Sequence, residues 1–129
     1  MINWGDYPNF TKAEFDCKHT GRNEMSPDFM HRLQQLRTRF GRPMVITSGY
    51  RHPTHPIEAR KPNGPGAHAT GRACDVAVVG WDAMEMVFLA VQMGFTGIGI
   101  KQHGPSRFIH LDDLPASPGR PRPWMWSYP

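Results

Sequence analysis

Two short stretches of the chain decide how the protein folds. They are His68-Ala69-Thr70-Gly71-Arg72-Ala73-Cys74-Asp75 and Phe108-Ile109-His110-Leu111-Asp112. Each contains a segment with strand character, and alternate residues of a strand point to the same side of a sheet. His68 precedes the first strand on a loop in which Gly71 allows the chain to turn back. If the two strands are neighbours, His68, Asp75 and His110 converge on one point.

Two imidazoles and a carboxylate are the ligand set of a catalytic zinc ion, which keeps one coordination position open for water. A buried carboxylate between apolar residues is costly unless a partner compensates its charge, and a metal ion at Asp75 does so directly. Cys74 is not expected to be a ligand, because adjacent strand residues point to opposite faces. The chain has seven histidines, so chance clusters are easy. The other five are treated as non-ligands, although two of them could approach from a loop (His52 and His55; the rest are His19, His31 and His103).

The composition is that of an ordinary globular domain. The chain has 129 residues, of which 39% are hydrophobic and 20% are charged, and we expect residues 1–129 to form a single domain. Thirteen glycines and thirteen prolines predict many loops, and a metal ion is one way to hold a loop-rich small domain together. Cys17 and Cys74 are too few for a disulfide framework, and two buried free thiols are favoured over one bridge.

The charge and the N-terminal sequence bear on where the protein acts. A net charge of +4 favours an anionic partner, although solubility alone explains it equally well. No apolar run approaches the roughly 20 residues of a membrane span, and residues 1–12 lack a secretory signal. We therefore expect a protein made in the cytoplasm that reaches any outside target by another route. No motif supports nucleic-acid binding.

Helix signals appear twice in the first third of the chain. A capping box at residues 11–14 predicts a short helix over residues 11–16. Ser26 as N-cap and Pro27 at the first helical position predict a second helix, which ends at Gly41. The apolar face of this second helix contains Phe29, Leu33, Leu36 and Phe40.

The remaining elements follow from short apolar runs and turn residues. Strands are expected at residues 44–48, 73–79, 97–100 and 107–112, the last two forming a hairpin through residues 103–106. A capping pair, Asp82 and Glu85, predicts a third helix, which ends near Gly94. Its apolar face contains Met84, Val87, Phe88 and Val91. The proline-rich segment 52–67 is a long loop, and such loops are usually functional or mobile. The order of elements predicts an α+β fold with a small, mostly antiparallel sheet and flanking helices.

The tail, residues 114–129, contains five prolines and should be extended rather than helical. Trp124, Trp126 and Tyr128 alternate along it and can share one face. Packing of these rings back onto the domain is favoured over a role in stacking with a ligand.

Three motifs occur in order along the chain: Ser48-Gly49-Tyr50-Arg51, then His68, Gly71, Ala73 and Asp75, then His110-Leu111-Asp112. Together they resemble the D-Ala-D-Ala carboxypeptidase family of zinc peptidases. That family includes phage L-alanyl-D-glutamate endolysins and vancomycin-resistance dipeptidases, and it shares its fold with the hedgehog signalling domain. The likeness extends over residues 10–112. It implies that His68, Asp75 and His110 bind zinc, that Ser48 and Tyr50 contact the substrate, and that the substrate is a peptidoglycan stem peptide.

The mechanism of hydrolysis then follows from the expected zinc ion. Water activated by zinc attacks the scissile carbonyl, and a carboxylate carries the proton to the leaving amine. Arg51 is the candidate for stabilising the oxyanion, with a surface salt bridge as the alternative. Asp112 is the candidate base, or else a residue that orients a histidine ligand. Some relatives have a histidine where this chain has Phe108, and others have a glutamate near residues 103–105, so the base stays open.

Two functions are compatible with these residues. The first is a cell-wall peptidase, either a phage endolysin or virion-associated lysin released through a holin or by injection, or a bacterial wall-remodelling enzyme. The second is a zinc-bearing module that has lost catalysis and binds a partner. Nothing in the sequence requires more than a monomer, and the sequence does not decide which peptide bond is cut.

Overall fold

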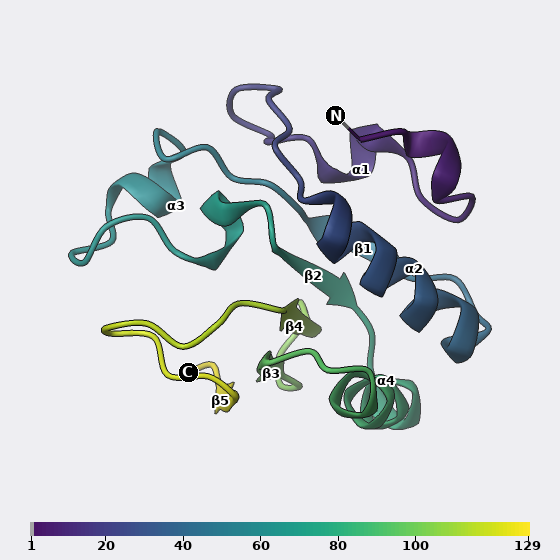
Figure 1. The fold of residues 1–129 in the computed structure, drawn as a ribbon. Helices are drawn as coiled ribbons and strands as arrows, with labels where there is room; N and C mark the ends of the chain where they lie inside the picture. The colour runs from purple at the N-terminus through teal and green to yellow at the C-terminus, as the bar shows by residue number, and fades with distance from the viewer. Residues whose placement is uncertain (1) are drawn as a thin grey trace.

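The computed structural model describes residues 2–129, which form one five-stranded sheet with helices on both sides (Figure 1). The strands are β1 (Val45–Ser48), β2 (Ala73–Ala77), β3 (Gly97–Lys101), β4 (Phe108–Asp112) and β5 (Trp124–Ser127). The α-helices are α1 (Lys12–Phe15), α2 (Pro27–Phe40), α3 (Pro56–Ala59) and α4 (Gly80–Gln92). Two short 3₁₀ helices complete the fold, η1 (Trp4–Asp6) and η2 (Ala67–Thr70).

The sheet has the order β1-β2-β4-β3-β5. The pairs β1–β2, β2–β4 and β3–β4 are antiparallel, and only β3–β5 is parallel. The predicted α+β class with a mostly antiparallel sheet is therefore confirmed, and so is the hairpin that joins β3 to β4. The tail departs from the expectation of a merely extended segment, because its last residues form the edge strand β5.

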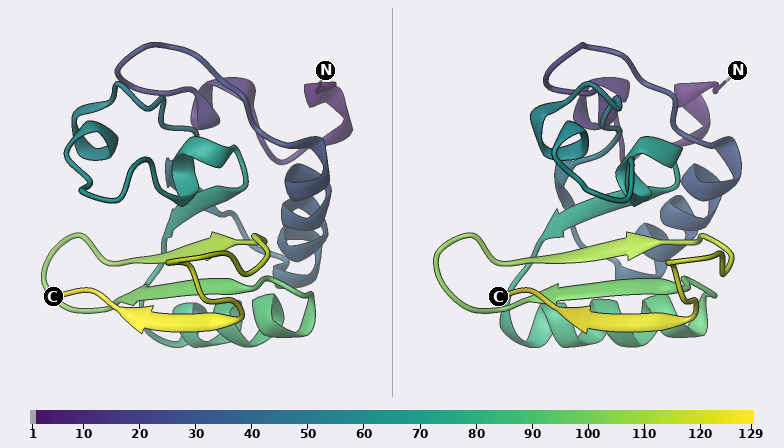
Figure 2. Two further views of the ribbon diagram at one scale, coloured as in Figure 1. Left: turned by 60° about the vertical axis from the view of Figure 1, so that its left-hand side comes forward. Right: turned by 90° about the vertical axis from the view of Figure 1, so that its left-hand side faces the viewer.

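The two faces of the sheet have different characters. Alternate residues of the central strands pack with α2 and α4 into the hydrophobic core, and these include Cys74, Val76, Ile98, Ile109 and Leu111. The residues between them point to the other face, beside α3, η2 and the connection that leads to β5 (Figures 1 and 2). Since one face carries the core, the other is available for polar side chains.

Helix α2 begins and ends where the sequence predicts. The Ser26 hydroxyl accepts a hydrogen bond from the backbone N–H of Phe29, and Gly41 closes the helix in the left-handed conformation with φ of 73°. Left-handed backbone suits glycine, which has no Cβ to clash. All four predicted core residues of this helix are buried, as are both cysteines, which are free thiols.

Helix α4 differs from the prediction in its start and in its buried face. It begins at Gly80 with Val79 as N-cap, and the Asp82 carboxylate pairs with Arg42 instead of capping the helix. The residues buried are Ala83, Met86, Leu89 and Ala90, whereas Met84, Phe88 and Val91 of the predicted face are more than 60% exposed. The helix is apolar around most of its circumference, so periodicity alone could not identify the side that meets the sheet.

The predicted loop at residues 52–67 is more ordered than its prolines suggest. It contains one helical turn, α3, and the start of η2. Within the described part of the chain, no helix is both long enough and apolar enough to cross a membrane.

Candidate metal centre

Strands β2 and β4 place the two predicted strand ligands directly opposite each other. In their antiparallel register Asp75 pairs with His110, and Val76 pairs with Ile109. Side chains of directly opposed residues point to the same face and lie about 5 Å apart at Cβ. The Asp75 and His110 side chains therefore meet on the face away from the core.

His68 reaches the same point from η2. This short helix ends at Gly71, whose φ of 77° is left-handed. A Cβ on Gly71 would lie 2.0 Å from the carbonyl oxygen of Glu24, so no other residue fits the turn that leads into β2. Nδ1 of His68 lies 2.8 Å from the carbonyl oxygen of Gly49. That oxygen can only accept, so Nδ1 carries the hydrogen and the electron pair of Nε2 points toward the strands.

The three side chains form one compact group of possible ligand atoms. Nε2 of His68 lies 3.2 Å from Oδ1 of Asp75, and Nδ1 of His110 lies 3.1 Å from the same oxygen. One ligand atom from each of the three residues lies within 4.8 Å of the others, and all three residues are buried. The structure thus brings together the predicted ligands His68, Asp75 and His110.

The chemistry of this group suits a zinc ion. Burial lowers the pKa of His68 more than the attraction of Asp75 raises it, so the ring is neutral and its Nε2 is an electron-pair donor. Burial would raise the pKa of Asp75, but both histidines outweigh it and hold the pKa far below its usual value, so the group is a carboxylate. Two imidazoles and one carboxylate leave a fourth position open, as in catalytic zinc sites.

Asp112 lies beneath His110 and is completely buried. Its Oδ2 lies 2.8 Å from Nε2 of His110, and both of its oxygens accept hydrogen bonds from the guanidinium of Arg122, at 2.9 and 2.8 Å. Burial would raise the pKa of Asp112, but the hydrogen bonds with His110 and Arg122 lower it to about 2. Of the two roles that the sequence leaves open, this geometry favours the orientation of a histidine ligand.

His110 is held between two carboxylates. Burial alone would lower its pKa, but hydrogen bonds with Asp112 and Asp75 raise it. Because Nε2 faces Asp112 and Nδ1 faces Asp75, Nδ1 is the atom that can bind a metal ion. The other ring nitrogen of each histidine ligand therefore has an oxygen partner, which is the usual arrangement around protein-bound zinc.

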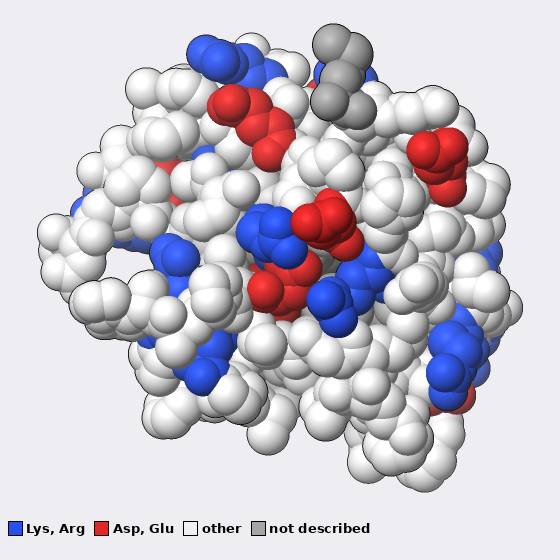
Figure 3. Space-filling model, in the orientation of Figure 1, with Lys and Arg blue, Asp and Glu red and all other residues white. Residues whose placement is uncertain are grey.

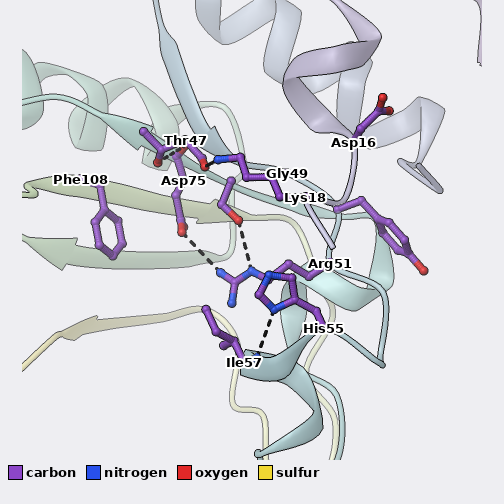
Figure 4. A pocket seen from close by; sticks show the side chains of 11 residues that line it. Asp16, Lys18, Thr47, Gly49, Arg51, His55, Ile57, Asp75 and Phe108 are labelled. Carbon is purple, nitrogen blue, oxygen red and sulfur yellow. Dashed lines mark hydrogen bonds and ion pairs between the residues drawn. The ribbon is translucent and has the colours of Figure 1, made fainter. Parts of the chain in front are cut away.

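Arg51 lies beside the ligands and points its guanidinium toward Asp75 (Figure 4). One terminal nitrogen is 3.6 Å from Oδ2 of Asp75, the other is 3.1 Å from Glu58, and Nε donates to the Ser48 hydroxyl at 3.2 Å. The side chain of Arg51 is only 13% exposed. Ser48, predicted to contact the substrate, thus holds Arg51 and also lines the pocket beside it.

Tyr50, the other predicted substrate contact, is buried. It lines the same pocket, but its hydroxyl donates to Glu24 at 2.7 Å. Burial and this hydrogen bond raise the pKa of Tyr50 to about 12. The Tyr50 side chain therefore supports the wall of the pocket, with its hydroxyl bound to Glu24.

Three residues of the site were not predicted from the sequence. Glu58 anchors Arg51 from the proline-rich loop, Arg122 anchors Asp112 from the tail, and the Trp126 ring lies 5.1 Å from the His110 ring. The alternating aromatic residues of the tail were a signal for Trp126. Trp126 and Tyr128 pack against the domain, as the sequence favoured, whereas Trp124 is 54% exposed. Neither charged residue belongs to a motif with the ligands.

Comparison with known proteins agrees with this geometry. The family model of peptidase M15 matches residues 8–112. The chain belongs to the peptidase M15 family. A search of curated proteins finds no match. M15 peptidases are zinc enzymes, and the matched segment contains all three residues of the His68–Asp75–His110 group.

Proposed function

We propose that this M15 peptidase hydrolyses an amide bond in the peptide part of bacterial peptidoglycan. The observation that carries the proposal is a cavity of about 380 Å³ in which all three ligands meet Arg51. The cavity is also lined by three aromatic side chains, Phe108, Trp126 and Tyr128, and by the cationic side chains of Lys61, Arg120 and Arg122. A peptide with aliphatic side chains and free carboxylates fits such a lining.

The residues of this cavity have different roles in the proposed hydrolysis. His68, Asp75 and His110 would hold zinc, which when bound polarises a carbonyl and lowers the pKa of a water molecule. Arg51 lies next to Asp75, and a guanidinium can donate hydrogen bonds to the oxygen that becomes anionic during attack. Glu58 and Ser48 fix the direction of that guanidinium.

Asp112 acts in this proposal by orienting His110 and not by accepting the proton of water. Both of its oxygens are engaged and its pKa is about 2, which is low for a base that works near neutral pH. Among residues 2–129, Asp75 is the one carboxylate that lines the cavity. Asp75 is itself a ligand, and its pKa is held far below the usual value. The proton of the attacking water therefore passes to solvent, and the leaving amine takes up a proton from solvent.

The place of action is also a proposal. On the described part of the face in Figure 3, acidic and basic side chains stand next to each other, so that face has no broad basic surface. Lys61 and Arg120, which line the cavity, are the candidate contacts for an anionic wall peptide, because the guanidinium of Arg122 is already bound to Asp112. We propose that a monomer works on the wall as a phage lysin, after holin release or from the virion.

The test is mass spectrometry of fragments released when the zinc-loaded protein is incubated with purified peptidoglycan. Loss of terminal D-Ala would identify a carboxypeptidase, free stem peptides an L-alanyl-D-glutamate endopeptidase, and opened cross-links a D,D-endopeptidase. His110→Ala, which removes one ligand, should release nothing. Arg51→Gln should retain zinc and lose about 100-fold or more in rate, as loss of an oxyanion donor usually does.

A second candidate is a zinc-bearing binding module without catalysis. It is favoured because, among residues 2–129, no carboxylate other than the ligand Asp75 lines the cavity. It predicts that zinc-loaded protein sediments with peptidoglycan but releases no fragment from walls of several cross-link types. That pair of results would replace the peptidase proposal. Release by wild-type protein together with none by His110→Ala would exclude the binding module.

A further inference from the structure

The C-terminal segment that follows the family match is built into the metal centre. The match ends at residue 112, yet β5 runs parallel to β3, with Gly97 opposite Trp124 and Gly99 opposite Trp126. This pairing makes β5 the edge strand beside β3, and the connection that leads from β4 to β5 passes over the face that carries the ligands (Figure 2).

The first link between the segment and the ligands is polar. Arg122 binds both oxygens of Asp112 in a fork, and its side chain is only 8% exposed. Asp112 in turn binds Nε2 of His110 at 2.8 Å. Such a two-pronged pair fixes the plane of the carboxylate, which a single hydrogen bond does not. The orientation of the His110 ring is therefore tied to the position of Arg122.

The second link is aromatic. The Trp126 ring lies 5.1 Å from the His110 ring, and the Arg122 guanidinium lies 5.2 Å from the Trp126 centroid. These three side chains form one cluster on the sheet with tilted rings, and Tyr128 extends the cluster to Phe108 at 5.0 Å. Trp126 thus packs against His110, which is buried.

Two glycines of strand β3 leave room for the Asp112 carboxylate and for the Trp126 ring. A Cβ on Gly97 would lie 2.3 Å from the carboxylate oxygens of Asp112, and a Cβ on Gly99 would lie 2.8 Å from the Trp126 ring. Real side chains do not approach so closely, so the two glycines leave the room that these groups occupy. Gly97, Gly99, Asp112, Arg122 and Trp126 thus form one fitted unit.

We propose that Arg122 is a positioning residue of the metal centre, which acts through Asp112 to hold His110 with Nδ1 toward the zinc ion, and that Trp126 covers the ring. The segment 120–128 is then a working part of the site and not a mere appendage of the domain. Partners behind a metal ligand typically contribute about 10- to 100-fold to metal affinity. The inference concerns zinc binding, so it stands apart from which bond is cut.

Zinc affinity, measured by competition with a chromogenic chelator, tests the proposal without any assay of hydrolysis. Arg122→Gln should bind zinc about 10- to 100-fold more weakly. The zinc affinity of Arg122→Lys should lie between those of wild type and Arg122→Gln, because lysine keeps the charge but cannot form the two-pronged pair. Arg107→Gln, which changes an exposed hairpin arginine bound to a backbone carbonyl, should leave the affinity unchanged. For the aromatic link, Trp126→Leu should weaken binding more than Trp124→Leu, since Trp124 is 54% exposed.

A double-mutant cycle separates positioning from simple loss of stability. If Arg122 acts through Asp112, Arg122→Gln should have little further effect on zinc affinity once Asp112→Asn is present. Circular dichroism and thermal melting of each metal-free variant identify any that fails to fold, and the milder Arg122→Lys then carries the test. Unchanged zinc affinity in folded Arg122→Gln, or full additivity in the cycle, would overturn the proposal. If Arg122→Gln binds zinc more weakly but the wild-type protein hydrolyses nothing, the peptidase proposal is wrong and the positioning role of Arg122 still holds.

Discussion

Glu58→Gln tests whether a buried ion pair in the proline-rich loop supports both the fold and the site. The Glu58 side chain is completely buried and its carboxylate binds Arg51 at 3.1 Å, Lys61 at 3.1 Å and the backbone N–H of Gly66 at 2.7 Å. Glutamine keeps the size of the side chain and can still accept from Gly66. It removes the charge that Arg51 faces.

The expected loss of stability follows from these three contacts. A buried hydrogen bond to a charged group contributes about 1.5–3 kcal/mol. The Lys61 side chain is 37% exposed, so solvent screens its pairing with Glu58 and its loss adds only a few tenths of a kcal/mol. We therefore expect Glu58→Gln to lower the free energy of unfolding by about 2–3 kcal/mol. For a domain of this size that corresponds to a fall in Tm of roughly 8–12 °C.

The assay is thermal unfolding of wild-type and variant protein at saturating zinc, across a range of pH. Glu85→Gln is the matched control, because it removes the same charge from a pair with Arg42 in which both side chains are about 40% exposed. Exposed pairs contribute at most about 1 kcal/mol, so the control should shift Tm by less than about 4 °C. A shift for Glu58→Gln no larger than that of the control would refute the reasoning.

The pH dependence gives a second check with a definite sign. Burial would raise the pKa of Glu58, but the Gly66 N–H, Lys61 and Arg51 outweigh it and lower the pKa below its ordinary value of 4.5. The unfolded chain therefore binds the proton more readily than the folded protein does. The contribution of Glu58 is complete above pH 4.5 and disappears as the pH falls through the lower pKa of the folded state. The Tm difference between wild type and Glu58→Gln should thus be largest near neutral pH and shrink in acid.

Three further changes test other parts of the structure. Asp113→Asn breaks the fork with Arg72 (2.9 and 2.8 Å) at a side chain only 2% exposed, and should cost about 2–4 kcal/mol in chemical denaturation. Gly71→Ala would force a Cβ to within 2.0 Å of the Glu24 carbonyl at a φ of 77°, so we expect poor folding and little zinc binding. Gly41 has a similar φ but open space around it. Gly41→Ala should therefore lower the free energy of unfolding by only about 1 kcal/mol. Removal of zinc with a chelator should lower Tm, because a ligand at 1,000 times its Kd stabilises the folded state by about 4 kcal/mol; an unchanged Tm would show that the site holds no metal.

The convergence of His68, Asp75 and His110 could be predicted only on the condition that β2 and β4 are neighbours, which the resemblance to a known family supports. The side that Asp75 and His110 face within each strand is decided locally, by alternation along β2 and β4. The same holds for α2, because neighbouring residues determine its start after Ser26 and its end at Gly41. These predictions rest on interactions within a few positions along the chain.

The supporting contacts could not be predicted, since they join distant segments. Arg122 meets Asp112 only because β5 lies beside β3, and a parallel pairing of a proline-rich tail has no pattern of its own in the sequence. The buried face of α4 was misassigned for a related reason. Met84 and Phe88 are as apolar as Met86 and Leu89, and the side that meets the sheet is decided by tertiary packing.

The architecture explains how so small a domain can hold a metal ion in a site whose ligands are buried and oriented. One face of the sheet is committed to the core with α2 and α4, so the ligands must lie on the other face, which would be open to water without a cover. Trp126 and Arg122 supply that cover from β5, while α3 and η2 supply it from the proline-rich loop. Each cover also carries a charged residue that fixes a group of the site: Arg122 fixes Asp112, and Glu58 fixes Arg51. The loop-rich segments are therefore part of the site, because they orient the side chains of Asp112 and Arg51 next to the ligands that the central strands carry.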